Sequence, residues 1–312
     1  RAVIFYHGWS PFRRIDCVYV DVATSTAMEL NYEDLQSHET RGYLHTYSWT
    51  SNTNYEVAFY VRDRVTAPEG WDLIQSGNGV KLYKKDYAGG QPDYVQEVDL
   101  QQASIAFHQG NGATASSSNP SPGLNKRNFH YGSGSFWNIY GGSAFSIVNA
   151  AFFNGANSES AFPIKYNGTI ISAGYGNNEP FPKRKLEING SSADVKSYNN
   201  TYNSFRSVTN NLGSVPTVMV GLHPLNAENN SVGRTFIGLL HSNSNEVYIF
   251  CSSYSTQVEA YNVLTNDFDC SGGEIVMLDG GGSSQFTCNG TNYVNSSDNP
   301  DRRIPSIIAV YE

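Results

Sequence analysis

Short runs that alternate apolar and polar residues recur along most of this chain, and they restrict it to a strand-rich fold. Such alternation is typical of strands with one buried face, whereas helices repeat their apolar positions with a longer period. Strands are predicted at residues 15–22, 55–61, 80–83, 94–100, 215–222, 235–240, 246–250, 274–278 and 304–311. Helical spacing is found at 143–151 and 256–264. We therefore predict an α+β protein with a mixed, strand-rich sheet core and a few helices.

The 312 residues give room for one large domain or two modest ones. Residues 1–70 are rich in Tyr and are predicted to form a β-rich N-terminal region of unknown role. We place a soft boundary near Pro68-Glu69-Gly70 and the main domain at 77–312. Residues 109–125 hold almost nothing that could pack, and we expect a long exposed loop there.

Composition excludes some partners and favours an extracellular setting. Charged residues make up only 15% of the chain, the net charge is −8, and no long basic run occurs, which argues against nucleic acid as a partner. No apolar stretch approaches the roughly 20 residues of a membrane span. Abundant Tyr, Asn and Ser are typical of secreted proteins. The chain starts at Arg1 rather than Met, so we expect either a trimmed chain or a removed signal segment.

The four cysteines match no zinc pattern and allow three disulfide pairings. We prefer Cys270 with Cys288 and Cys17 with Cys251, with four buried thiols as the alternative. Six Asn-x-Ser/Thr sequons allow glycosylation, but a chain so rich in these residues would contain about as many by chance. No metal triad is suggested by the histidines, so we expect no cofactor, although residues 266–269 leave calcium possible.

The strongest local signal is the run Asp279-Gly280-Gly281-Gly282-Ser283-Ser284, which follows the apolar strand Ile275–Leu278 directly. Consecutive glycines let the backbone approach a ligand closely, and their N–H groups can form an anion-binding nest. The strand would hold the Asp279 carboxylate in a fixed position, and the serines add hydroxyl groups. A simple glycine turn is the alternative interpretation of this run.

Two further residues are candidates for ligand binding. Asn149 precedes the aromatic pair Phe152-Phe153; its amide could cap a helix or bind sugar hydroxyls. Arg234 begins a predicted strand, where it could be a solvated charge or a planar clamp for a phosphate.

The order of five segments resembles the phosphodiester glycosidase family. These segments are NAAFFNG (149–155), NGTIIS (167–172), GRTFIGLL (233–240), EIVMLDGGGSS (274–284) and RRIPSIIAVY (302–311). The similarity covers about residues 77–312, and residues 1–70 fall outside it. The resemblance implies a hydrolase that cleaves a glycosyl-1-phosphodiester carrying an N-acetylglucosamine-like sugar in extracellular or envelope glycans.

Site residues follow from this resemblance position by position. Asp279 matches the aspartate of the family's DGGGS motif, and residues 280–284 match its glycine-serine loop. Arg234 matches an arginine that would bind phosphate, and Asn149 an asparagine that would bind the sugar. Glu259 is a candidate acid/base or a solvated helix charge, and Arg303 a candidate phosphate contact or an edge charge. Such groups suit an oxocarbenium-like transition state with a good leaving group.

A second function is compatible with the same residues. Low charge, abundant Tyr and Asn, and an N-terminal region outside the resemblance also suit a non-catalytic extracellular protein that binds sugar or assembles with copies of itself. An extended N-terminal segment could pair with the sheet edge of a neighbour and form an oligomer or filament.

Overall fold

The computed structural model describes residues 46–51, 54–59, 67–176, 180–199, 204–225, 230–298 and 301–312. The chain divides into two compact units, Arg1–Gly70 and Trp71–Glu312. In the first unit, β1 (Thr46–Ser51) and β2 (Asn54–Phe59) form an antiparallel hairpin. The strand predicted at 15–22 lies outside the described residues.

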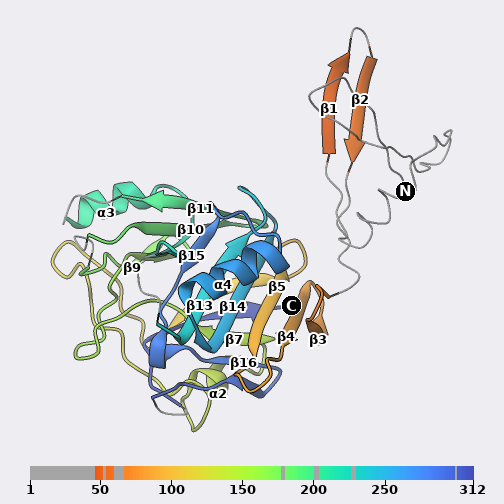
Figure 1. Ribbon diagram of the computed structural model, residues 1–312. Helices are drawn as coiled ribbons and strands as arrows, with labels where there is room; N and C mark the ends of the chain where they lie inside the picture. The colour runs from red at the N-terminus through yellow and green to blue at the C-terminus, as the bar shows by residue number, and fades with distance from the viewer. Residues whose placement is uncertain are drawn as a thin grey trace. The chain divides into compact units, whose positions relative to one another are not determined.

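Two sheets form the second unit (Figure 1). The larger has eleven strands, and its main path runs β11-β10-β12-β15-β13-β14-β5-β4-β3, with β8 beside β12 and β9 beside β8. The smaller has five strands in the order β17-β16-β7-β18-β6. The bounds of these strands are β3 Asp72–Gly77, β4 Val80–Lys85, β5 Asp93–Asp99, β6 Ser104–Gln109, β7 Ser146–Asn149, β8 Ile164–Tyr166, β9 Thr169–Ser172, β10 Lys183–Asn189, β11 Ser192–Tyr198, β12 Thr217–Leu222, β13 Val232–Leu239, β14 Glu246–Ser255, β15 Ile275–Met277, β16 Phe286–Cys288, β17 Thr291–Val294 and β18 Ser306–Tyr311.

The predicted strand-rich core with few helices is confirmed, but one detail is corrected. Every strand pair within the described part of the chain is antiparallel, where we expected a mixed sheet. Short connections account for antiparallel pairs that are adjacent in sequence, such as β4 with β5, but not for pairs of distant strands such as β14 with β5. Parallel neighbours need long crossovers, usually helical, whereas antiparallel neighbours are joined by tight turns such as the one after β4 at Gly89.

The two sheets pack face to face around one apolar core. The larger sheet contributes residues such as Leu82, Ile237 and Val276, and the smaller sheet contributes Val148 and Ile308, all essentially inaccessible to solvent. Each such side chain stabilises the fold by roughly 1.5–3 kcal/mol relative to an exposed one. The sandwich therefore depends on contacts between strands that are far apart in sequence.

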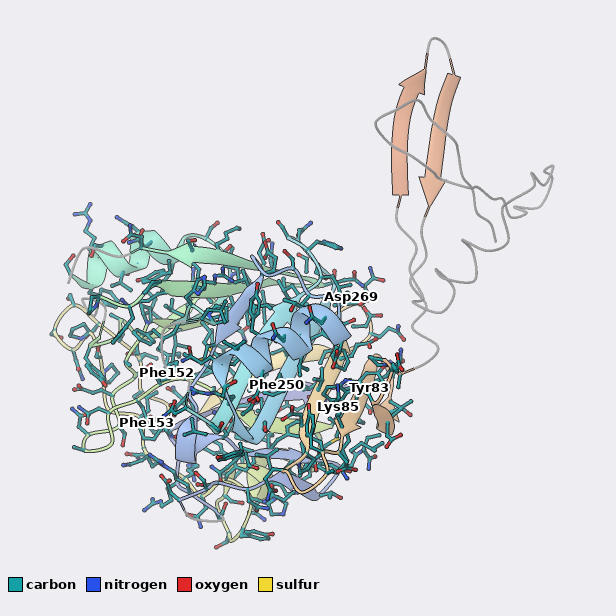
Figure 2. The ribbon with its side chains drawn as sticks, viewed as in Figure 1. Tyr83, Lys85, Phe152, Phe153, Phe250 and Asp269 are labelled. Atoms are coloured by element: carbon teal, nitrogen blue, oxygen red, sulfur yellow. The ribbon has the colours of Figure 1, made fainter. Side chains whose placement is uncertain are left out.

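Helical segments cover the outer faces of this sandwich. α4 (Gln257–Asn262) continues into η1 (Val263–Asp267) and lies over β13 and β14 (Figure 1). Phe268, which follows η1, packs against Tyr83 at a ring distance of 5.5 Å. Tyr83 and Lys85 project from β4 (Figure 2). The Lys85 ammonium donates to Asp267 Oδ2 at the end of η1, at 2.9 Å. α2 (Phe136–Tyr140) packs on the outer face of the smaller sheet, and α3 (Phe205–Leu212) packs near β12.

One helix prediction is confirmed and the other is wrong. Residues 256–264 form α4 and the start of η1, as the spacing indicated. Residues 143–151 instead contain β7, a strand between β16 and β18. All four residues of β7 are buried. A strand buried on both faces shows a continuous apolar run without alternation, and such a run is easily mistaken for a buried helix.

The predicted disulfides are not formed at the described cysteines. Cys251, Cys270 and Cys288 are buried free thiols, and Cys17 lies outside the described residues. Cys270 packs beside Gly238 on the face that α4 and η1 cover, whereas Cys288 pairs with Ser146 in the smaller sheet. The larger sheet therefore separates the two thiols that we expected to bond. Burial also raises the pKa of the Cys251 and Cys288 thiols to about 12.

Residues 110–125 form irregular structure, as predicted, but Leu124 anchors them in the core. None of the helices in the described ranges has the length and apolar character needed to cross a membrane.

Candidate functional site

The glycine-rich run forms the crossover between the two sheets. It leaves the larger sheet after β15 and enters the smaller sheet at β16. At its start, Leu278 N donates to Thr235 O at 2.9 Å, and Asp279 N donates to Ala150 O at 3.0 Å, just after β7. Main-chain hydrogen bonds to both sheets thus fix Asp279 where the sheets meet. This confirms that the carboxylate follows a buried strand.

Two glycines of the loop differ in what favours them: the backbone conformation at Gly281, and the space taken by neighbouring side-chain ends at Gly282. Gly281 has φ +59°, a left-handed conformation that side chains disfavour. At Gly282, an added Cβ would lie within 2.5 Å of both the Asp298 carboxylate and an Arg302 terminal nitrogen. Ser283 N and Ser284 N donate back to the carbonyls of residues 280 and 281 in the short helix η2 (Gly281–Ser283).

The N–H groups of Gly281 and Gly282 have no acceptor among the described residues. They are therefore the two backbone donors of this loop that remain for a ligand. An anion nest of this kind suits a phosphate or a carboxylate. The other four N–H groups of the run 279–284 already donate to acceptors within the protein, so the loop offers fewer free donors than its six residues suggest.

Asp279 is partly exposed, and its carboxyl group has a perturbed pKa. Burial raises the pKa to about 7, while hydrogen bonds from the Ser283 hydroxyl and the Gly280 N–H, together with the charge of Arg302, act in the opposite direction. The Gly280 N–H lies 3.0 Å from Asp279 Oδ1. A carboxyl group with such a pKa exchanges its proton near neutral pH, which is typical of catalytic acids and bases.

Arg302 is the cation that acts on Asp279, and our sequence reasoning did not select it. Its guanidinium pairs with Asp298 and lies 5.9 Å from the centre of the Phe153 ring. Its carbonyl oxygen accepts from Gln285 Nε2 at 3.0 Å, so the fully buried Gln285 fixes this segment. The doublet Arg302-Arg303 was the available signal, but the sequence does not show which arginine faces the loop.

The side-chain amide of Asn149 is buried and holds Asp279 in position. Its Nδ2 donates to Asp279 O at 2.7 Å, and its Oδ1 accepts from Thr235 Oγ1 at 2.7 Å and from Gln285 N at 3.2 Å. The side chain is 1% exposed. Its expected contact with a sugar hydroxyl is therefore replaced by an internal role, in which one amide joins β7, β13 and the crossover.

Arg234 lies at the same end of the larger sheet as Asp279. Phe236 pairs with Met277, and the ladder continues toward Arg234 on one strand and Asp279 on the other. The guanidinium is 5% exposed and donates to Ser255 O at 3.2 Å and to Asn230 O at 2.8 Å. These bonds hold it against the connection to α4, so its expected role as a phosphate clamp stays a prediction.

Glu259 has a structural role. Its carboxylate accepts from Thr256 N at 2.8 Å while its own N–H bonds the Thr256 hydroxyl, which is the capping box of α4. Burial raises the pKa values of Asp93 and Tyr87 and the charge of Glu259 adds to this, whereas Glu259 is not among the groups that shift the pKa of Asp279. We therefore do not retain Glu259 as the acid/base.

In the loop at 266–269, where the sequence left calcium possible, Asp267 is bonded to other residues. Asp267 Oδ2 accepts from Trp71 Nε1 at 2.8 Å and from Lys85 Nζ at 2.9 Å. Across the described ranges, no three His, Cys, Asp or Glu side chains gather in a way that could hold a metal ion.

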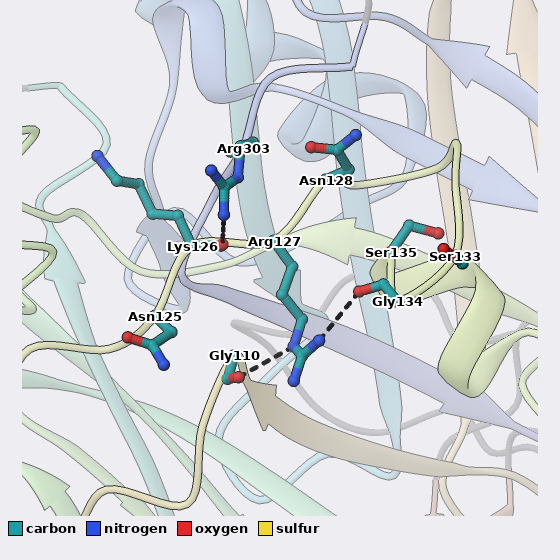
Figure 3. Close-up of a pocket in the computed structure, with 9 residues that line it drawn as sticks. All are labelled: Gly110, Asn125, Lys126, Arg127, Asn128, Ser133, Gly134, Ser135 and Arg303. Atoms are coloured by element: carbon teal, nitrogen blue, oxygen red, sulfur yellow. Dashed lines mark hydrogen bonds between the residues drawn. The ribbon is translucent and has the colours of Figure 1, made fainter.

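A separate surface pocket of about 500 Å³ contains Arg303 (Figure 3). Arg303 donates to Lys126 O at 2.7 Å, away from the glycine loop. The predicted phosphate contact is thus in a neighbouring pocket, and Arg302 occupies the position that we had expected for Arg303.

The fold and the site define a strand-rich, two-sheet protein with a glycine-rich loop at the end of the sandwich, in which a carboxyl group lies beside open backbone N–H groups. The model of the phosphodiester glycosidase family matches residues 143–311, more than half of the chain, and the chain belongs to this family. This match includes Asn149, Arg234, Asp279 and Arg302. A comparison with curated proteins finds no match.

Solved structures with a similar chain path include three proteins. The catalytic domain of zebrafish N-acetylglucosamine-1-phosphodiester alpha-N-acetylglucosaminidase, auto-inhibited by its pro-peptide, has a TM-score of 0.47 and 12% identity over 86% of this chain and 82% of its own. A hypothetical protein from Synechocystis has a TM-score of 0.47 and 11% identity, with coverages of 86% and 68%. A putative exported protein from Burkholderia pseudomallei has a TM-score of 0.37 and 8% identity, with coverages of 90% and 88%.

Proposed function

We propose that this protein hydrolyses a glycosyl-1-phosphodiester bond that carries an N-acetylglucosamine-like sugar. The observation that carries the proposal is the arrangement at the crossover, where the Asp279 carboxyl group, the Arg302 guanidinium and the open N–H groups of Gly281 and Gly282 come together. Membership of the phosphodiester glycosidase family supports the same reaction class.

The reaction requires little beyond charge stabilisation. The bond between sugar C1 and the phosphate oxygen breaks, both electrons leave with the phosphate, and positive charge develops at C1. The oxygen of a water molecule then bonds to C1 and gives up a proton. Ionised Asp279 can stabilise the developing charge directly or form a covalent bond with C1. In both cases its carboxylate acts on the sugar side of the scissile bond.

Arg302 and the glycine loop are assigned to the phosphate. A guanidinium binds two phosphate oxygens in a planar fork, and two adjacent N–H groups can bind a third. Asn149 acts indirectly, since its amide donates to the carbonyl of Asp279. Arg234 stays a proposed phosphate contact, and its bonds to Ser255 O and Asn230 O hold its guanidinium at the connection to α4. The donors are therefore in place before substrate binds, which is the condition for strong electrostatic stabilisation.

The test is release of free sugar from the methyl phosphodiester of N-acetylglucosamine-α-1-phosphate. We expect turnover by the natural protein, a loss of about a thousandfold or more in kcat for Asp279→Asn, and a loss of about a hundredfold for Arg302→Gln. The matched control is Arg206→Gln, because Arg206 is an exposed arginine on α3. Equal trace release by the natural protein and Asp279→Asn would refute catalysis, and sugar binding without turnover would support the non-catalytic alternative.

We also propose an extracellular setting, with substrate in extracellular or envelope glycans. The low charge content and the abundance of Asn and Ser support it. The described cysteines do not contribute to this argument, since they are free thiols.

A further inference from the structure

A second carboxylate, that of Asp298, lies against the glycine loop. Its Oδ2 accepts from Arg302 Nη1, so it pairs with the arginine that is proposed to bind the phosphate. An ideal Cβ on Gly282 would overlap the same oxygen, which shows that the carboxylate occupies the space where a side chain would stand. None of the roles proposed above for the loop uses this carboxylate.

A serine hydroxyl connects the main chain at Asp298 with the loop. Ser296 Oγ donates to Gly282 O, and Asp298 N donates to Ser296 Oγ at 3.2 Å. The Asp298 side chain is nevertheless 58% exposed, and an ion pair this exposed contributes little to the stability of a fold. Folding alone therefore does not explain the pair, and a substitution at Asp298 should leave the fold intact.

Arg302 keeps donors beside the one that Asp298 uses. Neither Nε nor Nη2 of its guanidinium has an acceptor among the residues that the structure describes. A phosphate bound to these donors and to the open N–H groups of Gly281 and Gly282 would share one guanidinium with the Asp298 carboxylate. Two anions on one guanidinium lie well within the distance over which physiological salt screens exposed charges, so each feels the other.

The charges around the loop suit a ligand with a single negative charge. Arg302 contributes one positive charge, and Asp298 cancels it. Ionised Asp279 adds a negative charge on the sugar side. Lys126 shares an aromatic neighbour with Arg302, but its ammonium donates to Gly155 O. A phosphodiester has one negative charge, whereas a phosphate monoester has two above its second pKa of about 6. The second charge of a monoester therefore meets a carboxylate rather than a cation.

We propose that Asp298 is a specificity residue, which selects phosphodiesters by repelling the second negative charge of phosphate monoesters. This inference rests on the proposed function and specifies its substrate class. The accepted ligand is a sugar phosphate whose phosphate carries a second organic substituent, and the free sugar-1-phosphate is rejected.

The same repulsion acts on the product. When the bond between C1 and the phosphate oxygen breaks, the phosphate keeps its other ester bond and takes both electrons, so a singly charged diester becomes a doubly charged monoester. Asp298 then favours release of this monoester from Arg302 and the loop. Selection of the substrate and release of the product thus depend on one carboxylate.

The first test measures product inhibition at pH 8 with the methyl phosphodiester of N-acetylglucosamine-α-1-phosphate as substrate and methyl phosphate as inhibitor. We expect Asp298→Asn to bind methyl phosphate about tenfold more tightly, while its KM for the diester falls by no more than about threefold, because repulsion grows with the charge of the ligand. Asp298→Glu keeps the charge and should keep the natural inhibition constant. The matched control is Asp86→Asn, which removes an equally exposed aspartate paired with Lys84.

A binding measurement separates this proposal from the proposed function. Asp279→Asn, which should not turn over, is titrated calorimetrically with N-acetylglucosamine-α-1-phosphate and with its methyl diester, with and without the Asp298→Asn change. Loss of the preference for the diester in the combined variant supports the inference even if no protein form is catalytic.

Two results overturn the role of Asp298 and leave the proposed hydrolysis intact. One is an unchanged preference for the diester without the Asp298 carboxylate. The other is equal weakening of both esters, which would show that Asp298 only holds Arg302 in place. Binding of neither ester by any form would overturn the proposed function together with this inference.

Discussion

Asp279 has a higher pKa than an ordinary aspartate because burial disfavours its charge more than its neighbours stabilise it. With a pKa of about 7, the carboxyl group is divided between its two protonation states near neutral pH. In the reaction proposed above, the ionised form acts on C1. Arg302 and the hydrogen-bond donors of the loop therefore stabilise the ionised form of Asp279, but too weakly to lower its pKa to that of an ordinary aspartate.

The first prediction concerns the pH dependence of the reaction. We expect kcat/KM to rise about tenfold per pH unit below pH 7 and to level off above it, because only the ionised carboxylate reacts and the free enzyme has a pKa of about 7. Initial rates between pH 5 and 9 measure this profile. A rate that falls through pH 7 would instead show that Asp279 acts as a protonated acid.

The second prediction concerns stability, for which the sign follows from the same pKa. The folded carboxyl group, with a pKa of about 7, holds its proton more tightly than an unfolded one at 3.8. This contribution to folding is complete below about pH 4 and is lost as the pH rises through 7. Asp279→Asn cannot lose it, so we expect this variant to gain on the order of 4 kcal/mol over the natural protein between pH 4 and pH 8, since each pKa unit corresponds to about 1.4 kcal/mol.

Urea unfolding at the two pH values tests this expectation. The conservative control is Asp99→Asn, an aspartate at the end of β5 that lies away from the loop. If Asp279→Asn is destabilised equally at both pH values, the carboxylate supports the fold rather than the reaction.

At the level of elements, α4 allows the structural role of Glu259 in the capping box to be tested separately from the catalytic role predicted for it. Glu259→Ala removes one half of the capping box, and we expect a loss of about 1 kcal/mol in the free energy of unfolding without a change in kcat/KM. Urea unfolding and the sugar-release assay measure the two effects. Val258→Ala, at an exposed position of the same helix, is the control for side-chain truncation. A rate loss above tenfold at unchanged stability would return Glu259 to the catalytic set.

Much of the sheet could be predicted from the sequence, because half-buried strands show their alternation directly. The strand at 80–83 was predicted in this way, and its residues Val80 and Leu82 are buried while Lys81 between them is partly exposed. The helix at 256–264 was predicted from its helical spacing instead. The strand β7 was missed because packing against both faces of the sheet buries all four of its residues, with Val148 on one side and Ile147 on the other, so no exposed position marks it as a strand. The antiparallel pairing of the strands is a property of the chain path, and no local pattern encodes it.

Site residues could be predicted from the sequence where they lie within a few residues of one another. The Asp279 run contains the carboxylate, the glycines and the turn within six residues. The roles of Asn149 and Arg302 depend instead on which way a side chain points after the sheets have packed. Asn149 points inward to the main chain of Asp279, and Arg302 rather than Arg303 points to the loop. Neither orientation follows from residue type.

For the molecule as a whole, we predict that stability does not depend on a disulfide between the described cysteines. The melting temperature should be the same with and without reductant, and Cys251, Cys270 and Cys288 should react with a thiol reagent only after unfolding, since all are buried. Mass spectrometry of protein labelled in denaturant without reductant measures this. A peptide pair that joins Cys270 to Cys288 would contradict it.

The position of the crossover has a consequence for how activity arises during folding. Asp279 is bound through its N–H to the end of β7, through its carbonyl to Asn149, and through the preceding residue to β13. Neither sheet alone can orient the carboxylate. A folding intermediate in which the sheets have formed but not yet packed together therefore lacks a formed active site. Recovery of turnover after dilution from denaturant should therefore lag behind the return of strand signal and coincide with closure of the sandwich.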